Sequence, residues 1–214
     1  MSAGGGTGGP DSAILEQFRR VGRDLFLAGA VSSHGGNLSV RLGDRIAITR
    51  RGAMLAHLEP RDVVVTGLEE NDANVLLAST EVNVHRAVYR ATAAQAIVHA
   101  HPPYTIARSL VCDEIVPVDS EGSYLLHKVP VVHAELTAGS AEVAALLERW
   151  LREYDVVVLR GHGPFAIGHL LEEAYQLVSV LEATCRILHL ADALRAAGHE
   201  VREYRKGSDR YTEW

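Results

Sequence analysis

Two segments of the chain place apolar residues at helical spacing over several turns. Near the start, Ile14, Phe18, Val21 and Leu25 recur every three or four residues, which predicts a helix. Asp11 or Ser12 can cap its beginning, and Gly29 stands where a left-handed C-terminal residue is expected. Near the end, residues 170 to about 197 predict a long helix. Its apolar side consists of Leu177, Leu181, Ile187, Leu188 and Leu194.

Between these helices, short β-branched runs alternate with shorter helical patterns. Strands are predicted at 38–42 and 45–49, joined by Gly43-Asp44 as a hairpin, and then at 62–66, 95–100, 115–118, 129–132, 155–160 and 165–167. Helices are predicted at 81–92, 104–111 and 141–153. No repeat or linker interrupts this order, so residues 11–214 are expected to form one α/β domain. Residues 1–10 are mostly Gly, Ser, Ala and Thr and are expected to be a flexible leader.

Composition narrows the function classes. The 27 acidic and 21 basic residues give a net charge of −6, and no basic cluster precedes the C-terminal tail, which disfavours nucleic-acid binding. Two cysteines, Cys112 and Cys185, are too few for a secreted disulfide scaffold. Neither a run of about 20 apolar residues nor a signal-peptide pattern is present. We therefore expect a cytoplasmic enzyme or binding domain.

Three histidines carry the strongest chemical signal. His99 and His101 are two residues apart at the end of a predicted strand, so their side chains point to the same face. His162 stands between two glycines directly after another buried strand. Three imidazoles with an open fourth position are typical of a catalytic zinc site. The other histidines, including His85, His127 and His133, show no such pairing and are expected at the surface or at the edge of the core.

Glu81 and the two residues before it allow two interpretations. Glu81 is a favourable first-turn residue of the predicted helix, and Ser79 and Thr80 are suitable caps. Alternatively, a carboxylate beside a metal can move a proton at a carbon next to a carbonyl, and hydroxyls at a helix N-terminus can bind an anion. The residues alone leave both interpretations open.

Five motifs in order resemble the class II aldolase/adducin family, most closely its fuculose-1-phosphate aldolase branch. They are residues 33–41 (SHGGNLSVR), 48–49 (IT), 79–81 (STE), 99–103 (HAHPP) and 159–163 (LRGHG). The resemblance covers residues 11 to about 194. It implies a three-layer α/β/α fold with a central, largely antiparallel sheet. It also implies a zinc ion held by His99, His101 and His162, and a homotetramer with active sites at the subunit interfaces.

The resemblance also implies roles for the residues around the histidines. Glu81 takes the position of the general acid/base. A substrate phosphate is expected to bind Ser79 and Thr80, the Asn37 side chain and the backbone at Gly36 and Gly52. The family usually has Pro and a small hydroxyl residue where this chain has Arg50 and Arg51. Either arginine can bind an anion through charge-assisted hydrogen bonds, so a carboxylate-bearing substrate stays open beside a phosphate.

A second departure concerns the acid that protonates the leaving alkoxide. The sugar-phosphate aldolases carry a Tyr near the position where this chain has Glu121, and Tyr124 is the nearest substitute. Tyr211 in the tail is a third candidate, which would act on a neighbouring subunit. The sequence leaves this acid unassigned.

The resemblance implies retro-aldol cleavage of a small ketose 1-phosphate to dihydroxyacetone phosphate and an aldehyde. Within the family, a methylthioribulose-1-phosphate dehydratase and a keto-acid decarboxylase are alternatives. Sugar-phosphate epimerases of the family usually have Asp where this chain has Glu81, which disfavours an epimerase. The adducin head is a cytoskeletal binding module without the zinc histidines, so the three histidines here disfavour a non-catalytic binding role.

Overall fold

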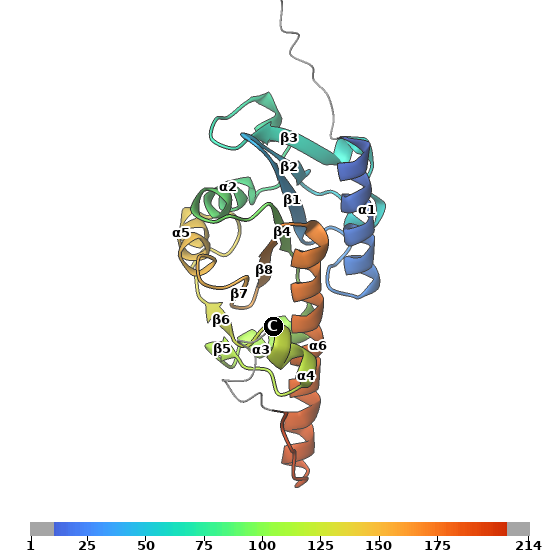
Figure 1. The fold of residues 1–214 in the computed structure, drawn as a ribbon, viewed down its shortest axis with the longest axis vertical. Coiled ribbons are helices and arrows are strands. Elements are labelled where there is room, and N and C mark those ends of the chain that lie inside the picture. The colour runs from blue at the N-terminus through green and yellow to red at the C-terminus, as the bar shows by residue number, and fades with distance from the viewer. Residues whose placement is uncertain (1–10, 205–214) are drawn as a thin grey trace, which may run out of the picture.

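A single eight-stranded sheet organises the computed structural model, which describes residues 11–204 (Figure 1). The strand order is β3-β2-β1-β4-β8-β7-β6-β5. Only β6 and β7 pair in parallel, and all other neighbours are antiparallel. The strands are β1 (Asn37–Leu42), β2 (Arg45–Thr49), β3 (Val63–Gly67), β4 (Ala96–His99), β5 (Glu114–Ile115), β6 (Val129–Val132), β7 (Val156–Leu159) and β8 (Gly163–Gly168).

Helices cover both faces of this sheet (Figure 1). The α-helices are α1 (Ser12–Leu27), α2 (Val82–Ala91), α3 (Pro103–Ser109), α4 (Ser120–Leu125), α5 (Ala141–Trp150) and α6 (Leu171–Ala196), and the short 3-10 helices are Leu55–His57, Pro60–Asp62 and Ala73–Leu76. One core lies between the sheet and α1 with α6, and the other lies between the sheet and α2 with α5. The expected three-layer α/β/α fold with a largely antiparallel sheet is therefore confirmed.

The first helix shows how local sequence sets an element's limits. Asp11 caps α1 by accepting a hydrogen bond from the backbone N–H of Ala13. After the helix, Gly29 has a φ of +71°, and the N–H of Ala30 returns to the carbonyl of Leu25. This pair of features is a Schellman ending, which a left-handed residue makes possible. Both predicted ends of the helix are confirmed.

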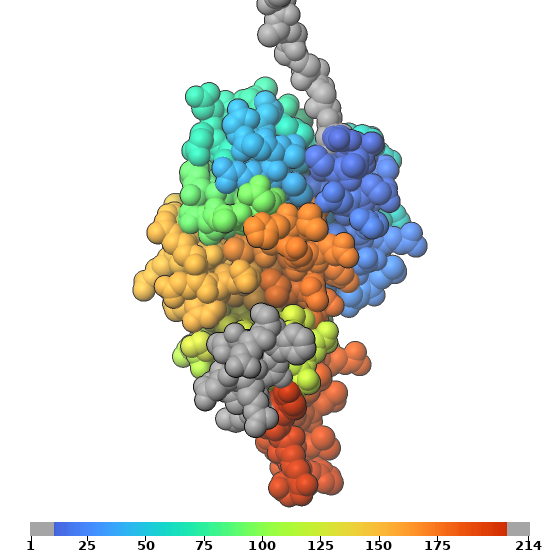
Figure 2. All heavy atoms as spheres, in the orientation of Figure 1, coloured from blue at the N-terminus to red at the C-terminus, as the bar shows by residue number. Residues whose placement is uncertain are grey.

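The long helix α6 projects beyond the rest of the molecule at its C-terminal end (Figures 1 and 2). Leu181 and Leu188, which the pattern places on its apolar side, are buried in the core cluster that α6 shares with α1 and the sheet. Ile187, Leu190 and Leu194 are instead exposed in the isolated chain, by 39%, 55% and 50%. This helix therefore carries more apolar surface than its own subunit covers.

Within residues 11–204, no helix has the length and apolar character that a membrane span requires.

The segment after β5 differs most from the prediction. The strand expected at 115–118 covers only Glu114–Ile115, because Pro117 and the turn toward α4 end the pairing. Helix α4, which no sequence pattern predicted, begins where Asp119 accepts a hydrogen bond from the N–H of Gly122. The expected leader at residues 1–10 and the candidate Tyr211 lie outside the described residues.

Candidate active site

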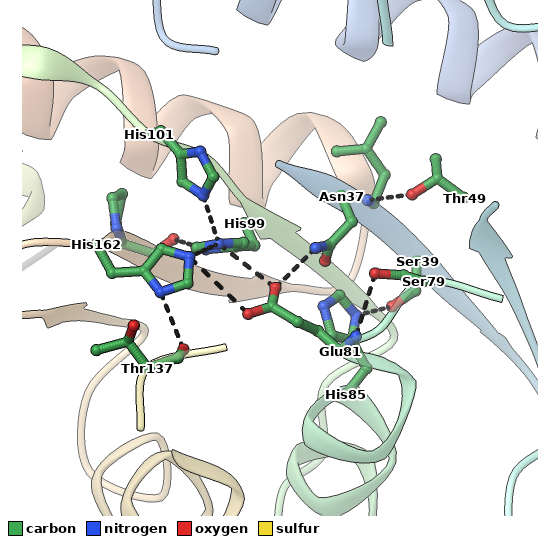
Figure 3. A network of polar contacts seen from close by, with 12 residues as sticks. Asn37, Ser39, Thr49, Ser79, Glu81, His85, His99, His101, Thr137 and His162 are labelled. Atoms are coloured by element: carbon green, nitrogen blue, oxygen red, sulfur yellow. Dashed lines mark hydrogen bonds and ion pairs between the residues drawn. The ribbon is translucent and has the colours of Figure 1, made fainter. Parts of the chain in front are cut away.

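The three candidate histidines converge at one end of the central strands (Figure 3). His99 ends β4, His101 follows two residues later, and His162 lies in the turn between β7 and β8. The Nε2 atom of His99 is 3.0 Å from Nε2 of His101 and 3.1 Å from Nε2 of His162. Pairing of β4 with β8 makes this possible, because it brings residue 162 beside the end of β4 although 60 residues separate the two histidine segments.

The turn that carries His162 needs glycine on both sides. Gly161 and Gly163 have φ values of +71° and +146°, which side chains rarely allow. A Cβ on Gly163 would lie 2.1 Å from the carbonyl oxygen of Ala100. This close approach of the two backbones is what places the imidazole of His162 over the end of β4.

Backbone carbonyls orient two of the three rings. Nδ1 of His99 is 2.9 Å from the carbonyl oxygen of Pro164, and Nδ1 of His162 is 2.9 Å from that of Thr137. A carbonyl oxygen only accepts, so each Nδ1 carries the proton and each Nε2 presents a lone pair. Lone pairs that meet this closely repel one another unless a cation lies between them. The donor set therefore fits a divalent transition metal such as zinc.

Burial keeps the rings of His99 and His101 neutral. It lowers the pKa of His99 well below the usual value, and the neighbouring imidazoles of His101 and His162 lower it further. The pKa of His101 is lowered for the same reasons, with a smaller opposing effect from Glu81. Neutral imidazole is the form that binds metal, so His99 and His101 are ready to bind an ion at neutral pH.

Glu81 places a buried carboxylate against the histidine cluster. It is the N-cap residue of α2, its backbone N–H donates to Oγ of Ser79, and only 3% of it is exposed. Its Oε2 accepts a 2.7 Å hydrogen bond from Asn37 and lies 3.4 Å from Nε2 of His99. Its Oε1 lies 4.0 Å from Nε2 of His162. The carboxylate can thus face either the metal position or a substrate bound beside it.

A second polar cluster lies beneath Glu81. Oγ of Ser39 is 2.6 Å from Nδ1 of His85 and 2.7 Å from the hydroxyl of Tyr89. His85 is fully buried, contrary to its expected place at the surface or core edge, and burial lowers its pKa to about 3. The missed signal is the spacing: His85 and Tyr89 follow Glu81 by four and eight residues, so all three lie on one face of a helix.

The pocket beside the histidines is small, about 220 Å³, and polar. Its lining contains all three histidines, Glu81 and every residue expected to contact the substrate anion: Gly36, Asn37, Arg51, Gly52, Ser79 and Thr80. A larger hollow of about 560 Å³ lies at the opposite end of β4 and β8, and it contains none of these residues. The structure therefore gathers the predicted metal, carboxylate and anion contacts in one place.

The two arginines of the pocket differ in their partners. Arg50 makes hydrogen bonds of 3.1 and 2.8 Å to Oδ1 of Asp62, so its guanidinium is already engaged. Arg51 is exposed, and within residues 11–204 its side chain has no hydrogen bond or ion pair. Gly52 follows with a φ of +66° in a turn closed by a 3.1 Å bond from the N–H of Ala53 to the carbonyl of Arg50. Arg51 is thus the arginine that is available to an anion.

Two of the three candidates for the second acid do not line this pocket. Glu121 and Tyr124 lie on α4, both are exposed, and neither belongs to the pocket lining. Tyr211 lies outside the described residues. The roles of all three stay predictions that depend on a neighbouring subunit.

Comparisons with known proteins agree with this geometry. The family model described as "Class II Aldolase and Adducin N-terminal domain" matches residues 16–189. The L-fuculose phosphate aldolase of Methanocaldococcus jannaschii is 33% identical over 175 residues, which cover 80% of this chain and 93% of that protein. The crystal structure of L-fuculose-1-phosphate aldolase from Thermus thermophilus superimposes with a TM-score of 0.84 at 37% identity, covering 89% of this chain and 100% of that one.

A relative with a different activity also matches. The 3-oxo-tetronate 4-phosphate decarboxylase of Escherichia coli K12 is 25% identical over 187 residues, which cover 84% of this chain and 88% of that protein. The family model spans most of the chain, and the Thermus thermophilus structure matches 89% of it. The chain therefore belongs to the class II aldolase and adducin family.

Proposed function

We propose that this chain is a zinc-dependent aldolase that cleaves a ketose 1-phosphate, of the L-fuculose 1-phosphate type, into dihydroxyacetone phosphate and an aldehyde. One observation carries the proposal: the Nε2 atoms of three histidines converge beside a buried carboxylate at the wall of a small polar pocket. The fuculose phosphate aldolases among the relatives support the substrate class.

His99, His101 and His162 would hold the metal. When bound, the ion supplies Lewis-acid stabilisation of the negative charge that develops on the carbonyl and hydroxyl oxygens during bond cleavage. The backbone carbonyls of Pro164 and Thr137 keep two of the rings in the tautomer that this binding requires.

Glu81 moves the proton at carbon. In the cleavage direction it protonates the carbon that has lost the aldehyde fragment, and in the reverse direction it removes that proton. Asn37 donates to one carboxylate oxygen and so limits the rotation of the group. Burial excludes water from competing for the same proton.

The substrate phosphate binds at the other wall of the pocket. Ser79 and Thr80 precede the N-terminus of α2, and the turn at Gly52 faces the same space. Arg51 adds a positive charge that the engaged Arg50 does not provide. Asn37 and the backbone at Gly36 complete the lining on the side of the histidines.

The functional unit is a homotetramer with active sites at subunit interfaces. The exposed apolar side chains of Ile187, Leu190 and Leu194 on the projecting end of α6 support contact with another subunit. A neighbouring chain would also supply the acid that protonates the leaving alkoxide, for which Glu121, Tyr124 and Tyr211 are the candidates. Light scattering tests this: a monomer of 23.2 kDa with full turnover would contradict it.

A decarboxylase acting on a phosphorylated keto acid is the second candidate, supported by the decarboxylase relative and by the unpaired Arg51. The deciding experiment incubates zinc-loaded protein with ketose 1-phosphates and, separately, with phosphorylated 3-keto acids. Release of dihydroxyacetone phosphate from a ketose 1-phosphate supports the aldolase. Release of CO₂ from a 3-keto acid, with no cleavage of the ketose 1-phosphates, supports the decarboxylase. The same protein freed of metal by a chelator is the control. Full activity after metal removal would contradict both.

A further inference from the structure

A chain of three buried polar side chains lies behind Glu81, between β1 and α2. Tyr89 contacts Ser39 through their hydroxyls at 2.7 Å, and Ser39 contacts Nδ1 of His85 at 2.6 Å. All three residues are 0% exposed. None of them lines the pocket, so neither metal binding nor anion binding accounts for them.

The hydrogen bonds that join these three side chains have one favourable donor-to-acceptor direction. If Tyr89 donates to Ser39 and Ser39 donates to Nδ1 of His85, both hydroxyl protons are used and His85 carries its proton on Nε2. In the opposite direction, the Tyr89 proton and the Nε2 lone pair would both be buried without partners. Burying a polar group without a partner costs about 1 to 3 kcal/mol. The first direction leaves one fewer unpartnered polar group, so Tyr89 donates to Ser39 and Ser39 donates to His85.

This direction leaves Nε2 of His85 as a buried donor one helical turn after the buried carboxylate of Glu81. Among the described residues, Nε2 of His85, Oε1 of Glu81 and Oδ1 of Asn37 are buried without hydrogen-bond partners. His85 follows Glu81 by one helical turn, and its backbone N–H donates to the carbonyl of Glu81 at 3.0 Å. Helical side chains lean toward the N-terminus, so the His85 ring leans toward Glu81, beside which Figure 3 shows it.

Packing holds the ring in this place. Phe165 stacks on His99 with centroids 3.9 Å apart and meets the His85 ring edge-on at 6.3 Å. The ring of His85 is therefore fixed between Ser39 and Phe165. A ring fixed in this way presents Nε2 in a constant direction.

We propose, resting on the function proposed above, that His85 is a positioning residue for Glu81. Its Nε2–H donates a hydrogen bond to Oε1 of Glu81 in the arrangement that exchanges a proton with the substrate carbon, while Asn37 holds Oε2. Two donors, one on each oxygen, then fix the plane of the carboxylate. Tyr89 and Ser39 act through His85 by setting its tautomer.

Two amide substitutions separate this role from a purely structural one. The amide nitrogen of Gln lies three bonds from Cβ, as Nε2 of His does, whereas that of Asn lies two bonds away, as Nδ1 does. His85→Gln therefore keeps the donor toward Glu81, and His85→Asn keeps only the contact with Ser39. A structural role predicts that Asn is the better substitute, and a positioning role predicts Gln.

The first measurement is turnover, with metal content and thermal unfolding recorded for each variant. We expect His85→Asn to lower kcat by about 10- to 100-fold with little change in KM, the range typical of residues that orient a catalytic group. His85→Gln should recover most of this loss. Equal kcat in the parent and in His85→Asn, or a deeper loss in His85→Gln than in His85→Asn, would overturn the proposal.

The second measurement does not depend on activity. Nitrogen-15 NMR of histidine-labelled protein distinguishes the two tautomers, and we expect His85 to carry its proton on Nε2. The resonance of that proton should move in Glu81→Gln and stay in place in Glu173→Gln, a change at the opposite end of β8. A proton on Nδ1 would refute the inference about His85 whether or not the chain is an aldolase. Absence of aldolase activity with the expected tautomer and shift would refute only the proposed function.

Discussion

Replacing Glu81 by Gln removes the negative charge at the site while keeping the shape of the side chain. The oxygen of the Gln amide can accept the same 2.7 Å hydrogen bond from Asn37 that Oε2 accepts now. The amide nitrogen would take the place of Oε1, which has no hydrogen-bond partner among the described residues. The substitution therefore breaks none of the hydrogen bonds that the structure shows for this carboxylate, and we expect it to change the free energy of unfolding by about 1 kcal/mol or less.

The effect on proton transfer should be far larger. Loss of a general acid/base lowers turnover by roughly 10² to 10⁴, which corresponds to about 3 to 5 kcal/mol of transition-state stabilisation. The change in stability and the change in rate therefore differ enough to be separated in one set of experiments. If Glu81 served only as the N-cap of α2, the rate would stay close to that of the parent.

The assay is exchange of the hydroxymethyl proton of dihydroxyacetone phosphate with deuterated water, followed by NMR. Exchange requires removal of a proton from carbon but no aldehyde, so the unassigned second acid does not affect it. Glu173→Gln is the matched control, because Glu173 accepts hydrogen bonds from the backbone N–H groups of His169 and Leu170 far from the pocket. Exchange at the parent rate in zinc-bound Glu81→Gln would refute the assignment of Glu81.

Three further changes test the anion site, the backbone and the acid stability. Arg51→Gln should weaken inhibition by inorganic phosphate about tenfold at low salt, since a hydrogen bond to a charged group is worth about 1.5 to 3 kcal/mol; unchanged inhibition would exclude Arg51 as an anion contact. Gly36→Ala should destabilise the fold by about 1 to 3 kcal/mol, because φ is +75° and a Cβ would lie 2.7 Å from a backbone carbonyl oxygen. Gly43→Ala, with φ of +67° and open space, should cost less in chemical denaturation, and equal costs would contradict the clash. Burial raises the pKa of Asp62, but hydrogen bonds from Arg50 and from the backbone outweigh it and lower the pKa below 3.8. The stability that this carboxylate contributes is thus complete above pH 3.8 and is lost as the pH falls below it, so Asp62→Asn should flatten the acid limb of the stability curve, measured by urea unfolding.

The sequence was sufficient to predict the helices and strands whose ends are set by residues adjacent to them in the sequence. Asp11 and Gly29 bound α1 because a cap and a left-handed residue act within one turn of the helix. The hairpin of β1 and β2 followed from the turn residues between them. The helix α4 was missed because residues 119–123 resemble a loop in composition, and its burial against α6 is what makes it helical.

In the candidate site, too, some residues could be predicted from the sequence and others could not. The pair His99 and His101 could be recognised because a strand repeats every two residues. The fully buried His85 was expected at the surface or core edge, because its contacts come from Ser39 on β1 and from Phe165, 80 residues away in the sequence. Sequence spacing carries no information about such pairs.

By itself, the sequence determined which residue types are available and how each short segment folds, because those choices depend on interactions within a few residues. It therefore supplied three imidazoles, a carboxylate next to two hydroxyls, and two arginines. Only the tertiary structure decided how they are used. Pairing of β4 with β8 brings His162 to His99, and Asp62 engages Arg50 while leaving Arg51 available. These decisions depend on strand order and on burial, which are properties of the whole packed chain and arise only when distant segments exclude water together.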